Sequence, residues 1–417
     1  MMKQKKTGVI TGNGRKNGMY HHGGEIYGQN IQYDFSVNVN PLGMPPGVKH
    51  FLRSEKALHY AGIYPQNGNA ELTEAIAKKE KVPPARIVCG NGASELIYAV
   101  FAALKPKSVL LSVPAFSEYE QAAVRHGSRV HYHDRMKEIL DKTAFPPDAS
   151  RTAPAAFASG REEDRGRTRA NILVQLQEEK PEMIVLCNPA NPTGECIPPL
   201  LMKRILELAG QLKSTVLVDE CFLPFVEGQE KRSAGTYLTD IGEEKSPALL
   251  ILKAFTKFYA MPGLRLGYLM GFGIDRTEKI RMFLPDWNVS SIAQQAGILA
   301  LGDERYEQDT REYLSPEREY MRTELGKLGA VIYGGEADFL FWRGKAGLKE
   351  ELFSRGILIR DCSNFRGLED APKGLCYYRT AIRRHEENEV LLWNLREVLT
   401  GVGNRRLPGD MDGNGIC

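Results

Sequence analysis

Lys257 stands where an amine could act as a nucleophile. It follows the apolar run 249–252, has a hydroxyl residue before it (Thr256) and is followed by the apolar stretch 258–262. Apolar surroundings lower the pKa of an amine and leave it neutral, as imine formation requires. A lone lysine is also compatible with an exposed loop, so the interpretation depends on three features upstream.

The first two features follow apolar runs that read as strands. Asp219 closes the run 215–218, and a carboxylate at the carboxyl end of a buried strand lies where open α/β sheets bind ligands. It could pair with a pyridinium nitrogen, or simply cap a helix. Asn191 lies in the segment 187–194, where two Asn-Pro steps hold an amide at the end of a strand. That segment is equally compatible with a purely structural turn.

The third feature is the glycine-rich bend 90–92, which leads into a mostly apolar stretch at 93–104. Free amides at a helix N-terminus, together with the helix dipole, form an anion site suited to phosphate. Glycine-rich turns are common, so this bend indicates a phosphate site only in combination with Lys257, Asp219 and Asn191.

The elements that must position these residues indicate an α/β fold. Short apolar runs separated by helical or long connections are typical of a mostly parallel, buried sheet. The strands are expected at 86–89, 109–113, 183–187, 215–218, 249–252 and 266–270, and helices at 71–81 and 93–104. Amphipathic segments at 293–301 and 307–328, short strands at 331–333, 339–342 and 356–359, and a helix at 386–399 indicate a smaller α+β domain.

These patterns divide the chain into expected parts. We expect a flexible leader (1–20), an N-terminal segment packing with the small domain (21–48), a large cofactor-binding domain (49–290), a small C-terminal domain (291–400) and a flexible tail (401–417). Residues 149–171 carry mixed charge and small residues without apolar anchors. They favour a solvated surface insertion, with a basic patch of four arginines as the alternative.

Composition excludes several classes of protein. The 417 residues carry 55 Lys and Arg against 52 Asp and Glu, a net charge of +3, which gives no basic footprint for nucleic acid. The sequence contains no apolar run of about 18 residues and no signal-peptide pattern, so no membrane span is expected. Seven scattered cysteines favour a reducing cytoplasm. The segment 410–415 lacks the spacing of a calcium loop, and no metal is expected.

Taken in chain order, these motifs resemble the fold-type I pyridoxal-phosphate enzymes of the class I/II aminotransferase superfamily. The ordered set is a Gly-Ala-Ser cup (92–94), Asn-Pro-Thr-Gly (191–194), a strand-end Asp219, Lys257, and Arg265 eight residues later. The resemblance covers roughly residues 20–400. It implies pyridoxal 5'-phosphate as cofactor and a large domain with a mostly parallel sheet beside a smaller α+β domain.

The resemblance also implies roles for individual residues. Lys257 would carry the cofactor as a Schiff base, Asp219 would pair with the ring nitrogen, and Asn191 would contact the ring oxygen. The cofactor phosphate would be held by Ala93, Ser94, Thr256 and Arg265, and Phe116 would stack on the ring. Tyr64 looks like the tyrosine that reaches the phosphate of the other subunit, which implies a homodimer.

Within the superfamily the sequence is similar to histidinol-phosphate aminotransferases and to L-threonine-O-3-phosphate decarboxylases of cobalamin biosynthesis. The stretches 22–24 with 34–43, 256–265 and 359–368 favour the decarboxylase branch. Both branches imply a small phosphorylated substrate, whose phosphate would be bound by His22, Asn38 and Arg360. Arg379 matches the arginine that holds the substrate carboxylate in the superfamily. L-Threonine O-3-phosphate is expected, and L-serine O-phosphate differs from it by one methyl group, which discriminates by only about 1–3 kcal/mol.

Two residues depart from the superfamily pattern. Ala254 stands where many members have Ser or Thr, and Phe222 where many have a tyrosine that donates to the ring oxygen. The loss of that donor would alter the pKa of the Schiff base rather than abolish cofactor binding.

Two alternative functions stay open. They are a histidinol-phosphate (or similar) aminotransferase and a protein that binds pyridoxal phosphate without turnover.

Overall fold

The computed structural model describes residues 23–137, 139, 171–241, 246–272, 274–369 and 371–401. The expected leader (1–20), all but the last residue of the expected insertion (149–171) and the tail after residue 401 lie outside these residues. His22 lies outside them as well.

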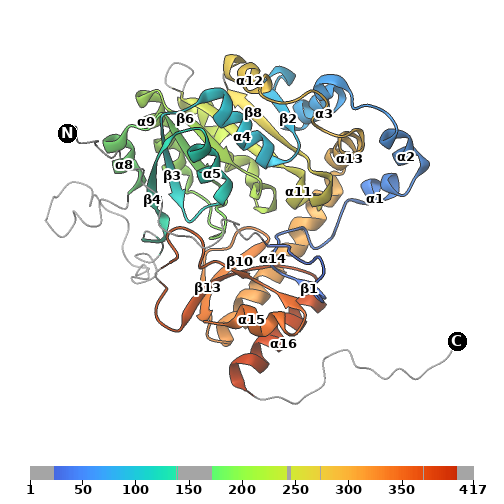
Figure 1. The fold of residues 1–417 in the computed structure, drawn as a ribbon, viewed down its shortest axis with the longest axis vertical. Coiled ribbons are helices and arrows are strands. Elements are labelled where there is room, and N and C mark those ends of the chain that lie inside the picture. The colour runs from blue at the N-terminus through green and yellow to red at the C-terminus, as the bar shows by residue number, and fades with distance from the viewer. Residues whose placement is uncertain are drawn as a thin grey trace, which may run out of the picture.

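A seven-stranded sheet forms the centre of the large domain, drawn in the upper half of Figure 1. Its order is β2-β8-β7-β6-β5-β3-β4, and only β8 runs antiparallel to its neighbours. The strands are β2 (Ile87–Gly90), β3 (Ser108–Val113), β4 (Arg129–Asp134), β5 (Met183–Cys187), β6 (Thr215–Asp219), β7 (Ala248–Ala254) and β8 (Gly267–Phe272). The α/β class and the six expected strands are confirmed. Strand β4 was not expected, because its sequence is polar and it lies at the edge of the sheet.

Helices cover both faces of this sheet and enclose two apolar cores. Residues of α3 and α9 belong to one core, and residues of α4 and α5 belong to the other. Within the described residues, the α-helices of the large domain include α1 (Pro46–Leu52), α2 (Glu55–Ala61), α3 (Ala70–Glu80), α4 (Ala93–Leu104), α5 (Ser117–Arg125), α8 (Ile172–Glu179), α9 (Pro199–Leu212), α10 (Leu238–Ile241), α11 (Phe255–Phe258), α12 (Ile274–Arg281) and α13 (Ser291–Leu301). Both helices expected in this region, at 71–81 and 93–104, are confirmed.

A four-stranded antiparallel sheet of order β12-β13-β10-β9 forms the small domain below it (Figure 1). Its elements are β9 (Val331–Tyr333), β10 (Phe339–Lys345), α15 (Leu348–Phe353), β11 (Ile357–Leu358), β12 (Arg360–Asp361), β13 (Leu375–Ala381) and α16 (His385–Thr400). Strand β13 was not expected from the sequence, although it pairs along its whole length with β10. The N-terminal strand β1 (Tyr33–Asp34) pairs in parallel with β11.

Helix α14 (Glu304–Lys327) joins the two domains by contributing to both cores. Tyr306 and Leu314 pack in the core of the large domain, whereas Met321 and Leu325 pack in that of the small domain. The expected boundary at residue 290 precedes α13, whose buried face packs in the core of the large domain with α1 and α3. Packing therefore places the division inside α14.

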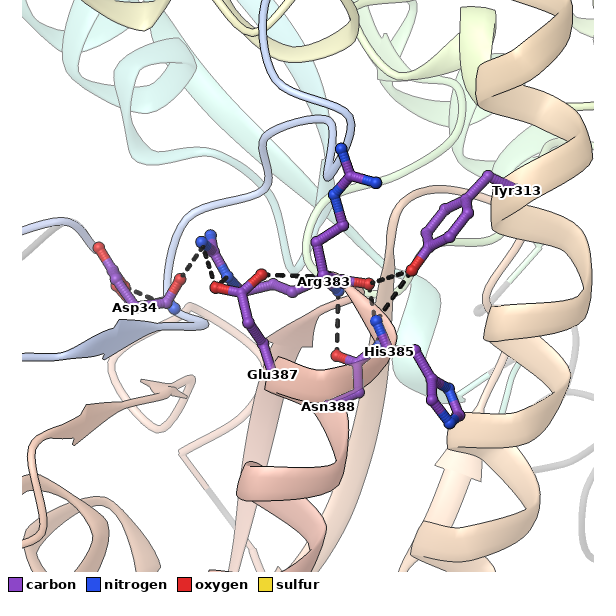
Figure 2. Close-up of polar contacts among 8 residues, drawn as sticks. Asp34, Tyr313, Arg383, His385, Glu387 and Asn388 are labelled. Carbon is purple, nitrogen blue, oxygen red and sulfur yellow. Dashed lines mark hydrogen bonds and ion pairs between the residues drawn. The ribbon is translucent and has the colours of Figure 1, made fainter. Parts of the chain in front are cut away.

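A polar cluster fastens the N-terminal segment, α14 and the start of α16 together, as Figure 2 shows. Arg383 donates to the carbonyl of Asp34 at 3.3 Å and to the carboxylate of Glu387 at 2.9 and 2.8 Å, and the backbone N–H of His385 donates to the Tyr313 hydroxyl at 2.9 Å. These contacts fix the chain directly after β13.

Two further expectations concern cysteines and membrane spans. The six cysteines within the described residues are free, with no disulfide among them. Among the helices of the described residues, none has both the length and the apolar character required to cross a membrane.

Candidate active site

A cavity of about 330 Å³ lies at the carboxyl ends of the parallel strands, where the small domain meets the large one. It brings together residues from the N-terminal segment, the central sheet and the small domain. The predicted site residues that line it are Asn38, Ala93, Ser94, Phe116, Asn191, Asp219, Thr256, Lys257, Arg265, Arg360 and Arg379. Ala254 and Phe222 line it too. Residues far apart in the sequence thus line one cavity.

Lys257 reaches the cavity from the one-turn helix α11, which follows β7 directly. Burial lowers the pKa of its amine, and the nearby positive charges of Arg379 and Arg265 lower it further. Asp338 opposes this shift. A lowered pKa increases the fraction of neutral amine, which is the form that attacks a carbonyl carbon.

Asp219 ends β6 and is held by two donors. The Tyr119 hydroxyl donates to Oδ2 at 2.5 Å, and the backbone N–H of Cys221 donates to Oδ1 at 2.9 Å. Burial raises the pKa of Asp219, while the charge of Lys257 and these hydrogen bonds lower it. A cation bound beside this fixed carboxylate would favour its ionised form. Sequence reasoning missed Tyr119, whose position one helical turn after Phe116 was the available signal.

The first turn of α4 forms an anion site at the far end of the cavity. Gly92 has φ +84°, and a Cβ there would lie 2.8 Å from a terminal nitrogen of Arg265. At Gly267 a Cβ would lie 2.9 Å from the backbone nitrogen of Ala93. Two glycines thus let the guanidinium and β8 approach the N-terminus of the helix, where unpaired N–H groups attract phosphate.

Asn191 and Arg379 form a bridge between the two domains. Arg379 donates to Asn191 Oδ1 at 2.5 Å and to the backbone carbonyl of Ser36 at 2.6 Å. With its oxygen occupied, Asn191 has its side-chain N–H groups left to offer to a ligand oxygen. Burial lowers the pKa of Arg379 to about 10, and its Nε lacks a hydrogen-bond partner among the described residues. The side-chain N–H groups of Asn191 and the Nε–H of Arg379 therefore remain available to donate to an anionic ligand.

Arg360 provides a second guanidinium beside the first. It stands directly opposite Arg379 in the antiparallel pairing of β12 with β13. Its terminal nitrogen donates to Asn364 Oδ1 at 2.8 Å, and its guanidinium lies 5.0 Å from the centre of the Phe365 ring. Paired positions on neighbouring strands place side chains on the same face, so two cations converge on one wall of the cavity.

Sequence reasoning also missed a contact between the two domains at the cavity rim. Arg366 donates to both carboxylate oxygens of Glu120, at 2.6 and 3.2 Å, and its guanidinium lies 4.2 Å from the centre of the Tyr132 ring. Glu120 is on α5 and Arg366 is on the loop after β12, and both line the cavity. No motif spacing could have indicated this pair, because 246 positions separate its members.

Tyr64 is the one described residue of the predicted set that does not line the cavity. Its side chain is 79% exposed, and its ring centre lies 4.8 Å from that of Trp287. An exposed tyrosine outside its own cavity is what a contribution to a partner's site requires. That contribution stays a prediction.

The residues present fit pyridoxal phosphate. A phosphate-sized anion site, a buried carboxylate and a lysine of lowered pKa occur in one cavity, as a phosphorylated, cationic ring with an aldehyde requires. Phe116, at the start of α5, supplies an aromatic side chain to the same space.

Comparison with known proteins gives the family. Residues 30–369 match Aminotransferase class I and II. The chain is 32% identical over 373 residues to threonine-phosphate decarboxylase of Salmonella typhimurium, covering 88% of this chain and 92% of that protein. It is 31% identical over 371 residues to histidinol-phosphate aminotransferase of Desulfitobacterium hafniense, covering 87% and 91%.

A solved structure agrees with this result. Histidinol-phosphate aminotransferase from Clostridium acetobutylicum superimposes with a TM-score of 0.70 at 26% identity, covering 89% of this chain and 100% of that one. The fold-type I architecture expected from the sequence is confirmed. The chain therefore belongs to the class I and II aminotransferase family and is a pyridoxal-phosphate-dependent enzyme.

Proposed function

We propose that this enzyme decarboxylates L-threonine O-3-phosphate to (R)-1-aminopropan-2-yl phosphate, which would serve cobalamin biosynthesis. The observation that carries the proposal is the pair Arg360 and Arg379, opposite one another on β12 and β13. The anion site at α4 accounts for the cofactor phosphate. Two further guanidinium groups suit a substrate with two more anionic groups, a carboxylate and a phosphate.

The residues of the large domain would hold the cofactor. Ala93, Ser94, Thr256 and Arg265 would bind its phosphate, Asp219 its ring nitrogen and Asn191 its ring oxygen, with Phe116 stacked on the ring. When bound, pyridoxal phosphate supplies an electron sink for negative charge at the substrate Cα.

The small domain and the N-terminal segment would orient the substrate. Arg379 would hold the carboxylate, and Arg360, Asn38 and His22 would hold the phosphate. Orientation decides the reaction, since the bond perpendicular to the ring is the one that breaks. Lys257 would then deliver a proton to Cα after carbon dioxide has left.

The identity to a threonine-phosphate decarboxylase over most of the chain supports this choice of substrate.

We further propose a homodimer in which Tyr64 of each subunit reaches the cofactor phosphate of the other. The exposure of Tyr64 supports this arrangement. Mixing Tyr64→Phe subunits with Lys257→Ala subunits tests it, because heterodimers would combine both defects in one site and leave the other intact. Recovery of activity above that of either variant is expected, and no recovery in proven heterodimers contradicts it.

Parallel assays distinguish the candidate functions. The purified enzyme is incubated with L-threonine O-3-phosphate, with L-serine O-phosphate, and with histidinol phosphate plus 2-oxoglutarate. We expect carbon dioxide and an amino-alcohol phosphate from the first. Glutamate from the third reaction without carbon dioxide from the others would identify an aminotransferase. Bound cofactor without any product would identify a protein that binds pyridoxal phosphate without turnover.

A further inference from the structure

The backbone of Lys257 is held by a residue of the N-terminal segment. Lys257 lies in the four-residue helix α11, and the last four carbonyls of an α-helix have no partner inside the helix. The backbone N–H of Asn40 donates to the Lys257 carbonyl at 3.1 Å, and Asn40 Nδ2 donates to the Phe258 carbonyl at 2.8 Å. The Lys257 carbonyl also accepts from the N–H of Ala260 at 3.2 Å. Asn40 Oδ1 accepts from the N–H of Leu42 at 3.0 Å, which fixes the orientation of the amide.

The interdomain helix α14 completes this arrangement. The Tyr306 hydroxyl shares its proton between the carbonyl of Phe258, at 2.9 Å, and the carbonyl of Gly43, at 2.7 Å. The Thr310 hydroxyl accepts from Asn40 Nδ2 at 2.8 Å and donates to the Tyr306 carbonyl at 2.7 Å. Asn40, Tyr306 and Thr310 are all buried, so water competes little for these hydrogen bonds. These three residues, called the clamp below, join the N-terminal segment and α14 to α11.

The same N-terminal segment also contacts the small domain. The carbonyl of Ser36 accepts from Arg379 at 2.6 Å, and Asn38 lines the cavity. Asn40 follows two positions later and holds the backbone of Lys257. This short stretch therefore connects Arg379, the cavity and the helix that carries the reactive amine.

We propose that Asn40 is a positioning residue, which holds the backbone of Lys257 so that its amine stands at the substrate Cα while the N-terminal segment is in place. The reaction that it serves rests on the proposed function. Carbon dioxide leaves, the bonding electron pair stays with the substrate, and the Lys257 ammonium gives a proton to Cα and regains one from solvent. Proton transfer needs close approach of donor and acceptor, and a displacement of about 1 Å can cost on the order of a hundredfold in rate.

Asn40→Asp tests this role with the least change in shape. The carboxylate keeps an oxygen for the N–H of Leu42, but it places a second acceptor against the Phe258 carbonyl, where Asn40 Nδ2 now donates. Two acceptors repel one another, so α11 should move away from the N-terminal segment. We expect kcat with L-threonine O-3-phosphate to fall about thirtyfold. KM should change by less than about threefold, because Arg360 and Arg379 remain to bind the substrate.

Asn394→Asp is the matched control. Asn394 is also buried, its Nδ2 donates to the carbonyl of Val390 at 2.9 Å, and it lies on α16 outside the cavity. The same substitution there should lower stability and leave kcat unchanged. Tyr306→Phe removes one hydroxyl of the clamp and should lower kcat about threefold, so the test survives if Asn40→Asp does not fold.

Hydrogen–deuterium exchange of the holoenzyme without substrate tests the clamp itself. Peptides that cover residues 39–43 and 255–262 should exchange faster in Asn40→Asp than in the wild type, because the clamp joins these two segments. The same peptides should exchange at the wild-type rate in Asn394→Asp.

The two measurements separate the ways in which the proposal can fail. Unchanged exchange at 255–262 in a folded Asn40→Asp enzyme overturns the assignment of Asn40 to Lys257. Faster exchange with unchanged kcat, a rise in KM alone, or an equal loss of kcat in Asn394→Asp overturns the positioning role. If the wild type releases no carbon dioxide, the proposed function fails, and kcat is compared for glutamate formation from histidinol phosphate and 2-oxoglutarate, which also moves a proton at Cα. If it forms neither product, exchange alone decides whether Asn40 holds Lys257.

Discussion

The two walls of the cavity are built in different ways. On the large-domain wall, Asp219 ends one strand of the sheet, and Asn191 and Lys257 come shortly after two others. The strand pairing aligns these strand ends, with Cys187 opposite Asp219 and Asp219 opposite Leu252. On the small-domain wall, Arg360 and Arg379 project from one face of an antiparallel sheet, and Asp338 precedes the adjoining strand. A shared sheet edge thus builds the proposed cofactor end, and side chains on a second sheet build the proposed substrate end.

This difference separates what the family shares from what a member can change. The ends of parallel strands are set by the fold, and ligands bind there in open α/β sheets generally. Side chains on the small-domain wall can be replaced without moving the sheet edge. We infer that the large-domain wall determines cofactor chemistry and that the small-domain wall determines which substrate and which bond are chosen.

Removal of Lys257, on the large-domain wall, should give the largest loss of activity. The loss should come from cofactor attachment and proton transfer. Lys257→Ala removes the amine that, under the proposed function, bonds to the cofactor and moves protons, and we expect a loss of roughly a thousandfold or more in kcat. Borohydride reduction followed by peptide mass measurement should find the cofactor on Lys257 in the wild type and nowhere in the variant. Lys279→Ala, an exposed lysine on α12, serves as the control. Cofactor attached to another lysine of the wild type would show that the site is misassigned.

Removal of Arg360, on the small-domain wall, should weaken substrate binding and leave cofactor binding unchanged. Arg360→Gln deletes one guanidinium of the proposed substrate site, and we expect KM for L-threonine O-3-phosphate to rise by roughly thirtyfold, as for loss of one partner of a partly buried charge pair. The absorbance of the bound cofactor should stay unchanged. Arg355→Gln is the matched control, because Arg355 donates to Asn394 on α16 and does not line the cavity. An unchanged KM, or a loss of bound cofactor, would contradict the division between the walls.

The contact between Glu120 and Arg366 should give the smallest effect, since it joins the walls rather than forming either one. The side chains are 19% and 35% exposed, so solvent weakens the pair. We expect Glu120→Gln and Arg366→Gln each to raise KM about two- to fivefold, and the double variant to be no worse than either single one. The coupling should decrease as salt is added. Fully additive effects would show that the pair does not link the loop to α5.

The success of sequence reasoning follows the same division. Asn191, Asp219, Lys257 and the α4 cup lie at strand and helix ends that apolar patterning locates, and the cavity contains all of them. Arg360 and Arg379 were predicted only through family resemblance, and the strand carrying Arg379 was not predicted at all. Tyr119 and the Glu120–Arg366 pair were missed, because their partners come from elements distant in the sequence.

The sequence by itself determined the α/β class, six strands of the central sheet and the positions of Asn191, Asp219 and Lys257 at strand ends, because local patterns of apolar residues and turns specify them. Only the tertiary structure decided that Arg360 and Arg379 line the same cavity as Lys257, and that α14 belongs to both cores. Burial and charge interactions depend on distances between elements. Those distances arise only when the two domains pack together.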